Sequence, residues 1–225
     1  MKKIIVLDVE GMSGKRPYDV GYIVADFKGR TYKERSFGCM PCVFENLSVS
    51  MRSAQEHVRE MTHRNIKEIL STPNKYEWVD IEQIKNSLVR DIVEYNVKEI
   101  WAYNCGFDKG MMVRLFDDDI FDKLGVVWLD IWSAIVMTKC LTKKYVRFCK
   151  SNGFITDKGN CKTSAEIVYA YLTNNPKFVE EHTGLEDCKI EYKILLTAKA
   201  TKKKIDGTLV HPWRLVKEFC EINGL

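Results

Sequence analysis

Ile4-Ile5-Val6-Leu7-Asp8-Val9-Glu10 is the stretch of this chain that decides the fold. Its apolar run is rich in β-branched side chains and predicts a buried strand. Side chains of a strand alternate between two faces, so Asp8 and Glu10 share one face, about 6.5–7 Å apart. Two such carboxylates repel each other and are costly to desolvate. A divalent cation bound by the carboxylate oxygens is the usual way to compensate this charge. The alternative is that one carboxylate forms a salt bridge and the other caps a turn.

A second strand is predicted over residues 98–103, and it leads into Asn104-Cys105-Gly106-Phe107-Asp108 and then a helical run over 111–116. Asp108 therefore lies near the start of a helix, and Phe107 is free to point into the core. Asp favours the N-cap position for backbone reasons, so capping is the alternative to metal binding for Asp108.

Residues 182–187 read His-Thr-Gly-Leu-Glu-Asp and lead into a predicted helix over 188–199. Two residues five positions apart on one helix point about 140° away from each other. His182 and Asp187 therefore face one site only if His182 precedes the helix and Asp187 lies in its first turns. Gly184 permits such a break in the chain.

The ordered motifs D-x-E, N-x-x-F-D and H-x-x-x-x-D resemble those of the DEDDh branch of the DnaQ-like 3′–5′ exonucleases. The residues that carry the resemblance are Asp8, Glu10, Asn104, Phe107, Asp108, His182 and Asp187. The similarity covers roughly residues 3–200. It implies an α/β, RNase H-like fold, in which a mixed β-sheet with three antiparallel strands followed by parallel strands is flanked by α-helices.

The resemblance also implies an activity, namely metal-dependent 3′–5′ exonuclease action that releases nucleoside monophosphates from nucleic-acid 3′ ends. Two Mg²⁺ or Mn²⁺ ions would lie between four carboxylates, and His182 would take the proton of the attacking water, a task that suits an imidazole near neutral pH. The expected metal ligands are Asp8, Glu10, Asp108 and Asp187, which form the catalytic set together with His182. The residues expected to bind the terminal nucleotide are Gly11, Met12, Ser13, Asn104 and Phe107.

Two departures from the family pattern bear on the substrate. Gly11-Met12-Ser13-Gly14 stands where relatives often carry a Thr-rich segment, and Tyr103 stands where many have His. Neither change removes a ligand carboxylate, so we expect substrate preference to differ more than chemistry. Single-stranded DNA is the expected substrate, in replication or repair. The alternatives are an RNA-trimming exoribonuclease and a non-catalytic, polymerase-associated module that binds nucleic acid.

Composition is compatible with this interpretation. The net charge of +4 is mildly basic, which suits a polyanionic ligand. Eight scattered cysteines are most simply reduced thiols, and Cys39-Met40-Pro41-Cys42 favours two thiols over zinc because no second ligand pair follows. The chain has no signal-peptide pattern, and no apolar run reaches the ~18 residues of a membrane helix. A cytoplasmic protein without a membrane partner is therefore expected.

Periodicity predicts further strands over 20–27, 31–39 and 126–129. Helices are predicted over 53–70, 80–95, 131–150, 163–173 and 212–222, and another from about 106. We expect a single domain over 1–225 with a C-terminal helical extension from about 207. The 212–222 helix has one apolar face, and packing back onto the domain is favoured over an oligomer or polymerase contact. Asp130, at the end of the 126–129 strand, is expected to cap the next helix.

Overall fold

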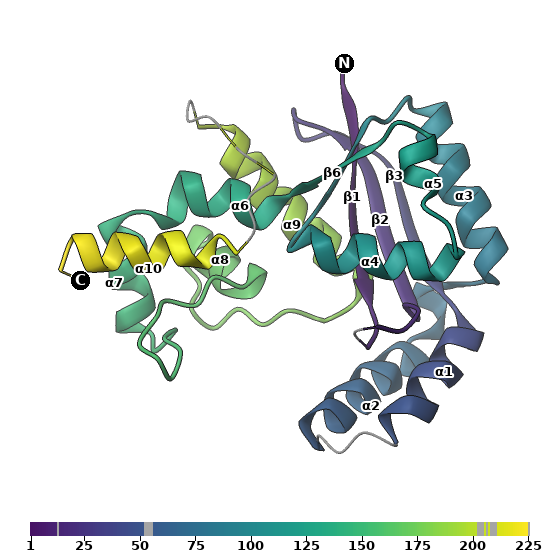
Figure 1. The fold of residues 1–225 in the computed structure, drawn as a ribbon, viewed down its shortest axis with the longest axis horizontal. Coiled ribbons are helices and arrows are strands. Elements are labelled where there is room, and N and C mark those ends of the chain that lie inside the picture. Colours follow the sequence, from purple (N-terminus) through teal and green to yellow (C-terminus); the bar gives the residue numbers. More distant parts are fainter. Residues whose placement is uncertain (13, 52–55, 202–204, 206, 208–210, 225) are drawn as a thin grey trace.

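A mixed sheet of six strands forms the centre of the computed structural model, which describes residues 1–12, 14–51, 56–201, 205, 207 and 211–224 (Figure 1). The strands are β1 (Lys3–Glu10), β2 (Asp19–Asp26), β3 (Thr31–Gly38), β4 (Glu77–Trp78), β5 (Glu99–Ala102) and β6 (Val127–Asp130). Their order is β4-β3-β2-β1-β5-β6. The first three strands pair antiparallel, whereas β5 runs parallel to β1 and β6 parallel to β5. The predicted α/β fold with a mixed sheet is thereby confirmed.

Helices cover both faces of the sheet, and strand β1 shows how two cores arise. Ile5, Leu7 and Val9 point into one core, while Ile4 and Val6 point into the other. The helices over the first core are α3 (Ile81–Glu94), α4 (Cys105–Phe116) and α5 (Ile120–Lys123). Those over the second include α6 (Ile131–Ile135) and α9 (Gly184–Lys199). Among the described residues, no helix combines the length and apolar character that crossing a membrane requires.

A lobe of helices lies beside the sheet, at the left of Figure 1. It consists of the π-helix η2 (Val136–Cys140), α7 (Lys143–Ser151), α8 (Ala165–Leu172) and α10 (Trp213–Ile222). Val216 of α10 is buried in the second core, and Leu215 and Phe219 pack against it. The prediction that this helix packs back onto the protein is confirmed, although Trp213 at its start remains 37% exposed.

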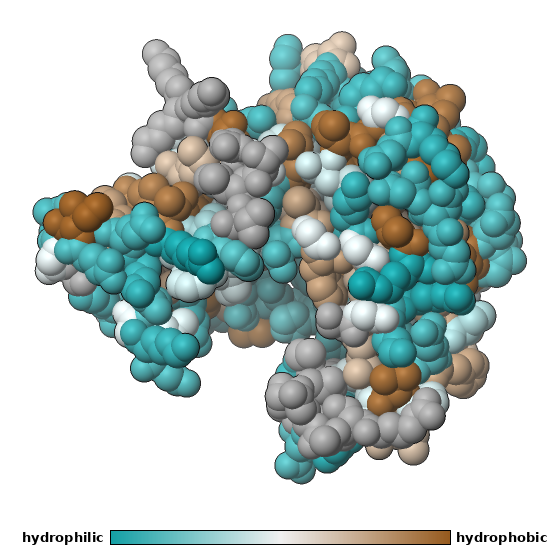
Figure 2. All heavy atoms as spheres, in the orientation of Figure 1, coloured by the Kyte–Doolittle hydropathy of each residue, from teal (hydrophilic) through white to brown (hydrophobic). Residues whose placement is uncertain are grey.

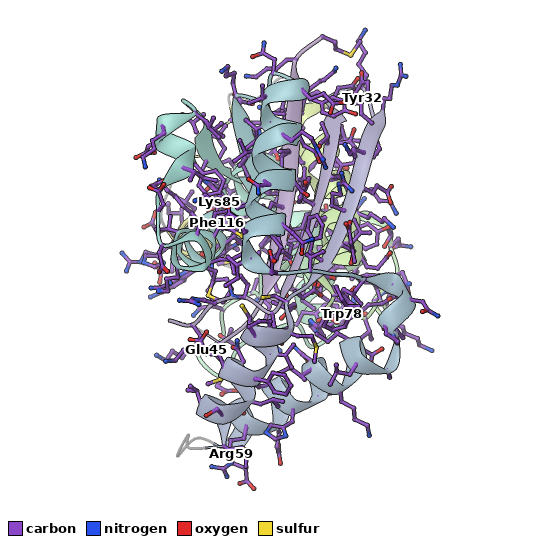
Figure 3. All side chains as sticks on the ribbon, turned by 90° about the vertical axis from the view of Figure 1, so that its right-hand side faces the viewer. Tyr32, Glu45, Arg59, Trp78, Lys85 and Phe116 are labelled. Carbon is purple, nitrogen blue, oxygen red and sulfur yellow. The ribbon has the colours of Figure 1, made fainter. Side chains whose placement is uncertain are left out.

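A helical hairpin projects beyond the end of the sheet at which β1 finishes (Figure 3). It consists of α1 (Met40–Ser50) and α2 (Glu56–Ser71), which pack against each other, and the short 3-10 helix η1 (Pro73–Lys75) follows. Arg59 marks the part of α2 that is far from the sheet. The hairpin closes one end of the first core through Val43, Ile66 and Ile69.

Three local predictions were wrong or incomplete. Helix α1 was not predicted, although Pro41 lies in its first turn, where proline is favoured. The predicted helix over 131–150 is interrupted, since Thr142 starts α7 by accepting a hydrogen bond from the Tyr145 amide at 3.1 Å. Strand β4, which pairs with β3, was also missed.

Candidate metal centre at the end of strand β1

Asp8 and Glu10 lie near the C-terminal end of β1, on the face that carries Ile4 and Val6, so both point toward α9. Asp8 pairs across the sheet with Gly21 of β2. A Cβ atom added at Gly21 would lie 2.0 Å from the carbonyl carbon of Gly184, the first residue of α9. Two glycines therefore let the start of α9 lie directly on the strand next to the carboxylates.

This close approach brings the third motif to the first. The ligand atoms of Glu10, His182 and Asp187 all lie within 4.8 Å of one another. His182 precedes α9 with a left-handed φ of +55°, and Asp187 lies in the first turn of the helix. The break that the sequence required at Gly184 is thus present, and it turns the imidazole and the carboxylate toward one site.

Asp108 reaches the same region from α4. Its side chain is only 2% exposed, and its Oδ1 accepts a hydrogen bond from the amide of Val9 at 3.3 Å. Asn104 occupies the N-cap position of α4 without a capping hydrogen bond from its side chain, and Asp108 lies within the first turn, so Asp108 does not have the capping role that was its alternative. Asp8 and Asp108 lie outside the 4.8 Å group described above. Phe107 packs against the first core, as predicted.

The carboxylates of this site lack enough neutralising partners. Asp8 Oδ2 and Asp187 Oδ1 are buried and accept no hydrogen bond from any described residue. Burial raises the pKa of Asp8 well above its usual value, and the charges of Glu191 and Asp108 raise it further. Burial likewise raises the pKa of Asp187 to about 8, with a contribution from Glu180. Orphaned carboxylate oxygens in a buried cluster match the oxygen ligands that Mg²⁺ and Mn²⁺ prefer, so the residues present fit such ions.

Two further carboxylates that we had not predicted adjoin the cluster. Glu191 is 3% exposed, and its Oε2 accepts a hydrogen bond from the amide of Tyr103 at 3.3 Å. It lies four residues after Asp187 on α9, a spacing that places both on one helix face and was visible in the sequence. Asp19 is fully buried, and its Oδ2 accepts hydrogen bonds from the Gly184 amide at 3.0 Å and the Tyr76 hydroxyl at 3.2 Å. No sequence signal singled out Asp19, which anchors the start of α9.

The helical hairpin holds the loop that follows β1. Asn46 of α1 accepts a hydrogen bond from the Met12 amide at 2.8 Å and donates to the Arg16 carbonyl at 2.8 Å. The Met12 amide is therefore engaged within the protein, and contact of Met12 with a substrate remains a prediction for its side chain. Ser13 lies outside the described residues. A Cβ atom added at Gly11 would lie 2.4 Å from Met111 Cε, so this glycine allows the loop to pack on α4.

Asn65 of α2 extends this support to the candidate metal centre itself. Its side-chain amide is 3.5 Å from Glu10 Oε2, to which it donates a hydrogen bond. Burial and the charges of Asp187 and Asp19 raise the pKa of Glu10, whereas the Asn65 contact lowers it. The hairpin therefore fixes the second carboxylate of the D-x-E pair.

Asp130 has the capping role that was expected. Its Oδ1 accepts hydrogen bonds from the amide of Trp132, at 2.7 Å, and from that of Asn104, at 3.2 Å. Asp130 thus begins α6 and ties the start of α4 to it. Asn104, predicted to bind substrate, is exposed with a left-handed φ of +61°.

The Cys39 and Cys42 thiols approach each other at the start of α1, with their sulfur atoms 2.8 Å apart. Both residues are buried. Within the described ranges, the group of side chains arranged to hold a metal is that of Glu10, His182 and Asp187, and it does not include these cysteines.

A search of protein-family models and a search of curated proteins each gave no match to this chain. Its function is therefore inferred from the chemistry of the site.

Proposed function

We propose that this protein is a metal-dependent 3′–5′ exonuclease that releases nucleoside monophosphates from nucleic-acid 3′ ends, with single-stranded DNA as the first candidate substrate. One observation carries the proposal. Carboxylates from three separate motifs, in the order seen in the DEDDh exonucleases, converge with a histidine at the end of β1, and two of their buried oxygens lack a partner among the described residues.

Asp8, Glu10, Asp108 and Asp187 are the residues that would hold two Mg²⁺ or Mn²⁺ ions. Bound ions at such a site supply an activated water and neutralise charge on the leaving oxygen. The β1 strand and α9 set the positions of three of these carboxylates, while the Val9 amide orients Asp108. Because these supports are buried backbone contacts, the ligands are held in place before any substrate arrives.

His182 is assigned as the general base. It lies in the left-handed turn before α9, with a ring nitrogen within 4.8 Å of ligand oxygens of Glu10 and Asp187. This position lets the imidazole accept the proton of a water held beside those carboxylates. The same proximity also suits a metal ligand, so activity and metal affinity must both be measured when His182 is replaced.

Two other functions remain as candidates. An RNA-trimming exoribonuclease needs the same carboxylates, and it differs from a DNA exonuclease in its contacts to the 2′-hydroxyl of the substrate. A non-catalytic nucleic-acid-binding module needs no cluster of unpaired buried carboxylates, and the cluster favours the enzyme over that module.

The test is release of mononucleotides from single-stranded DNA, duplex DNA and RNA, each labelled in separate preparations at its 3′ or 5′ end, with Mg²⁺ or Mn²⁺ present. The proposal expects early release of the 3′ label as a monophosphate, a ladder of 5′-labelled products and complete loss of both with a chelator. Equal cleavage at internal positions, or activity that survives chelation, would contradict it. Glu94→Ala, at an exposed position on α3, serves as a control for protein handling.

A further inference from the structure

A cavity of about 700 Å³ lies beside the metal centre, a volume in the range of small-ligand sites. Its walls come from the end of β5, the start of α6, the 156–165 segment and the first residue of α10. The aromatic residues that line it are Tyr103, Trp132 and Trp213. Figure 2 shows the helical lobe, which carries most of these walls, separated by a notch from the α1–α2 hairpin, and no described residue of the hairpin lines the cavity.

Hydrogen bonds within the protein fix the rings of Tyr103 and Trp132 and satisfy their polar atoms. The Tyr103 hydroxyl donates to the Thr163 carbonyl at 2.5 Å, and the Trp132 indole N–H donates to Thr163 Oγ1 at 2.9 Å. The two rings lie 6.1 Å apart between centroids, with planes 20° from parallel. Their polar atoms are satisfied within the protein, so what they offer a ligand is rigid aromatic surface.

The third ring differs in being accessible. Trp213 is 37% exposed, and the Arg214 guanidinium lies 5.6 Å from its ring centroid. Exposed Lys158 and Lys162 line the same cavity, together with one acidic residue, Asp157. Aromatic faces combined with exposed cations match the two parts of a nucleotide, since bases stack on rings and phosphates attract lysine and arginine.

The cavity begins next to the metal centre. Strand β5 runs parallel to β1 with Val6 paired to Trp101, which places Tyr103 at the level of Asp8. The Tyr103 amide donates to Glu191, a carboxylate whose charge raises the pKa of Asp8. Asn104, the next residue, also lines the cavity. A strand whose end lies at the carboxylates therefore has this cavity within reach of its next nucleotides.

From this arrangement we infer that the cavity binds an unpaired base of the substrate strand, upstream of the terminal nucleotide, with Trp213 as its stacking surface and Lys158 and Lys162 beside its phosphates. This inference rests on the proposed function. It gives the enzyme a reason to prefer single strands, because a base paired in a duplex is not free to enter. It also assigns a binding role to α10, which lies beyond the three motifs.

The test compares two substrates in the parent protein and in Trp213→Ala. One substrate is a single-stranded dT decamer, and the other is the p-nitrophenyl ester of thymidine 5′-monophosphate, which has no upstream base. We expect Trp213→Ala to raise KM for the decamer about 5- to 150-fold, in line with the loss of one base–aromatic stack, and to leave kcat and the ester reaction unchanged. Trp213→Phe, which retains a ring, is expected to restore most of the affinity.

Ile222→Ala is the matched control, since Ile222 lies at the other end of the same helix, is 84% exposed and is not among the residues that line the cavity. An unchanged KM for the decamer in Trp213→Ala would overturn the inference, as would an equal loss with the ester. If the parent hydrolyses neither substrate, the proposed function fails. Binding of a 5′-fluorescein dT decamer in the presence of a chelator then tests separately whether the cavity binds a base. Weaker binding by Trp213→Ala than by Ile222→Ala supports this inference, and equal binding overturns it.

Discussion

Two sites with buried carboxylates adjoin the sheet, and they differ in whether the protein's own side chains neutralise the carboxylate. Asp91 of α3 is fully buried, yet it accepts hydrogen bonds from Lys33 and the Tyr22 hydroxyl, both at 2.8 Å. Although burial alone would raise the pKa of Asp91, these contacts bring it below the usual value. No lysine or arginine among the described residues pairs with Asp8 or Asp187, and the pKa values of both are raised by burial and by neighbouring carboxylates. The protein therefore neutralises a structural carboxylate with its own side chains but leaves carboxylate oxygens at the β1 site without a partner among the described residues.

The comparison predicts where activity and stability separate. Exchanging Asp108 for Asn keeps the shape of the side chain and removes one ligand charge. We expect Asp108→Asn to lower turnover by about 10³-fold or more, because metal ions contribute several kcal/mol to such reactions. The folded protein should be no less stable, since removing one like charge relieves repulsion. Near-parent turnover in this variant, measured by nucleotide release, would remove Asp108 from the ligand set.

Replacing the histidine tests the base. His182→Ala is expected to lower turnover by about 10²–10⁴-fold, the usual contribution of a positioned general base. Affinity for Mn²⁺, measured by calorimetry, should change little, because imidazole is not a preferred ligand of these hard ions in a carboxylate site. Full turnover in His182→Ala would leave the residue with a structural role only, and lost Mn²⁺ binding would make it a ligand.

Replacing the structural carboxylate Asp91 should lower stability and leave turnover unchanged. Asp91→Asn removes the charge that Lys33 and Arg35 face, and losing one partner of a buried ion pair lowers stability by about 3 kcal/mol. Urea unfolding measures this loss, while nucleotide release at low temperature should stay near the parent rate. If Asp91→Asn instead abolished turnover without loss of stability, the division between structural and functional carboxylates would be wrong.

The raised pKa values predict a pH dependence for the metal-free protein. Burial raises the pKa of Asp187 to about 8 and that of Asp19 to about 7, so near neutral pH the folded state binds more protons than the unfolded state. Stability therefore falls as the pH rises toward 8. We expect a higher Tm at pH 6 than at pH 8, with each 1 kcal/mol appearing as roughly 2–4 °C. Mg²⁺ should reduce this difference, and Asp187→Asn should flatten it; a Tm that rises from pH 6 to pH 8 in chelator would contradict the account.

The sequence predicted those parts of the site whose geometry is local. The alternation of β1 placed Asp8 and Glu10 on one face, and the position of Gly184 allowed His182 to precede the helix. The fold followed because strand and helix periodicities were strong in these segments. Glu191 was also readable from its spacing to Asp187, and it was missed because it belongs to none of the three motifs.

Other features depend on contacts between distant segments, which periodicity does not report. A Cβ atom added at Gly21 would lie 2.0 Å from the Gly184 carbonyl carbon, so α9 can lie this close to β2 only with glycine there, but nothing in the order of residues pairs those two glycines. The α1–α2 hairpin supports Glu10 through Asn65, and this contact spans 55 positions. The cavity likewise joins Tyr103 with Trp213, residues that only the folded chain brings together.

The most direct test of the central claim is calorimetric titration of the metal-free protein with Mn²⁺ at pH 7.5, without nucleic acid. The account predicts saturable binding in the parent that is weakened by Asp8→Asn and by Asp187→Asn, and unchanged by Asp91→Asn, whose carboxylate the protein already neutralises. Absence of Mn²⁺ binding at millimolar concentration, or equal binding by the parent, Asp8→Asn and Asp187→Asn proteins, would contradict it.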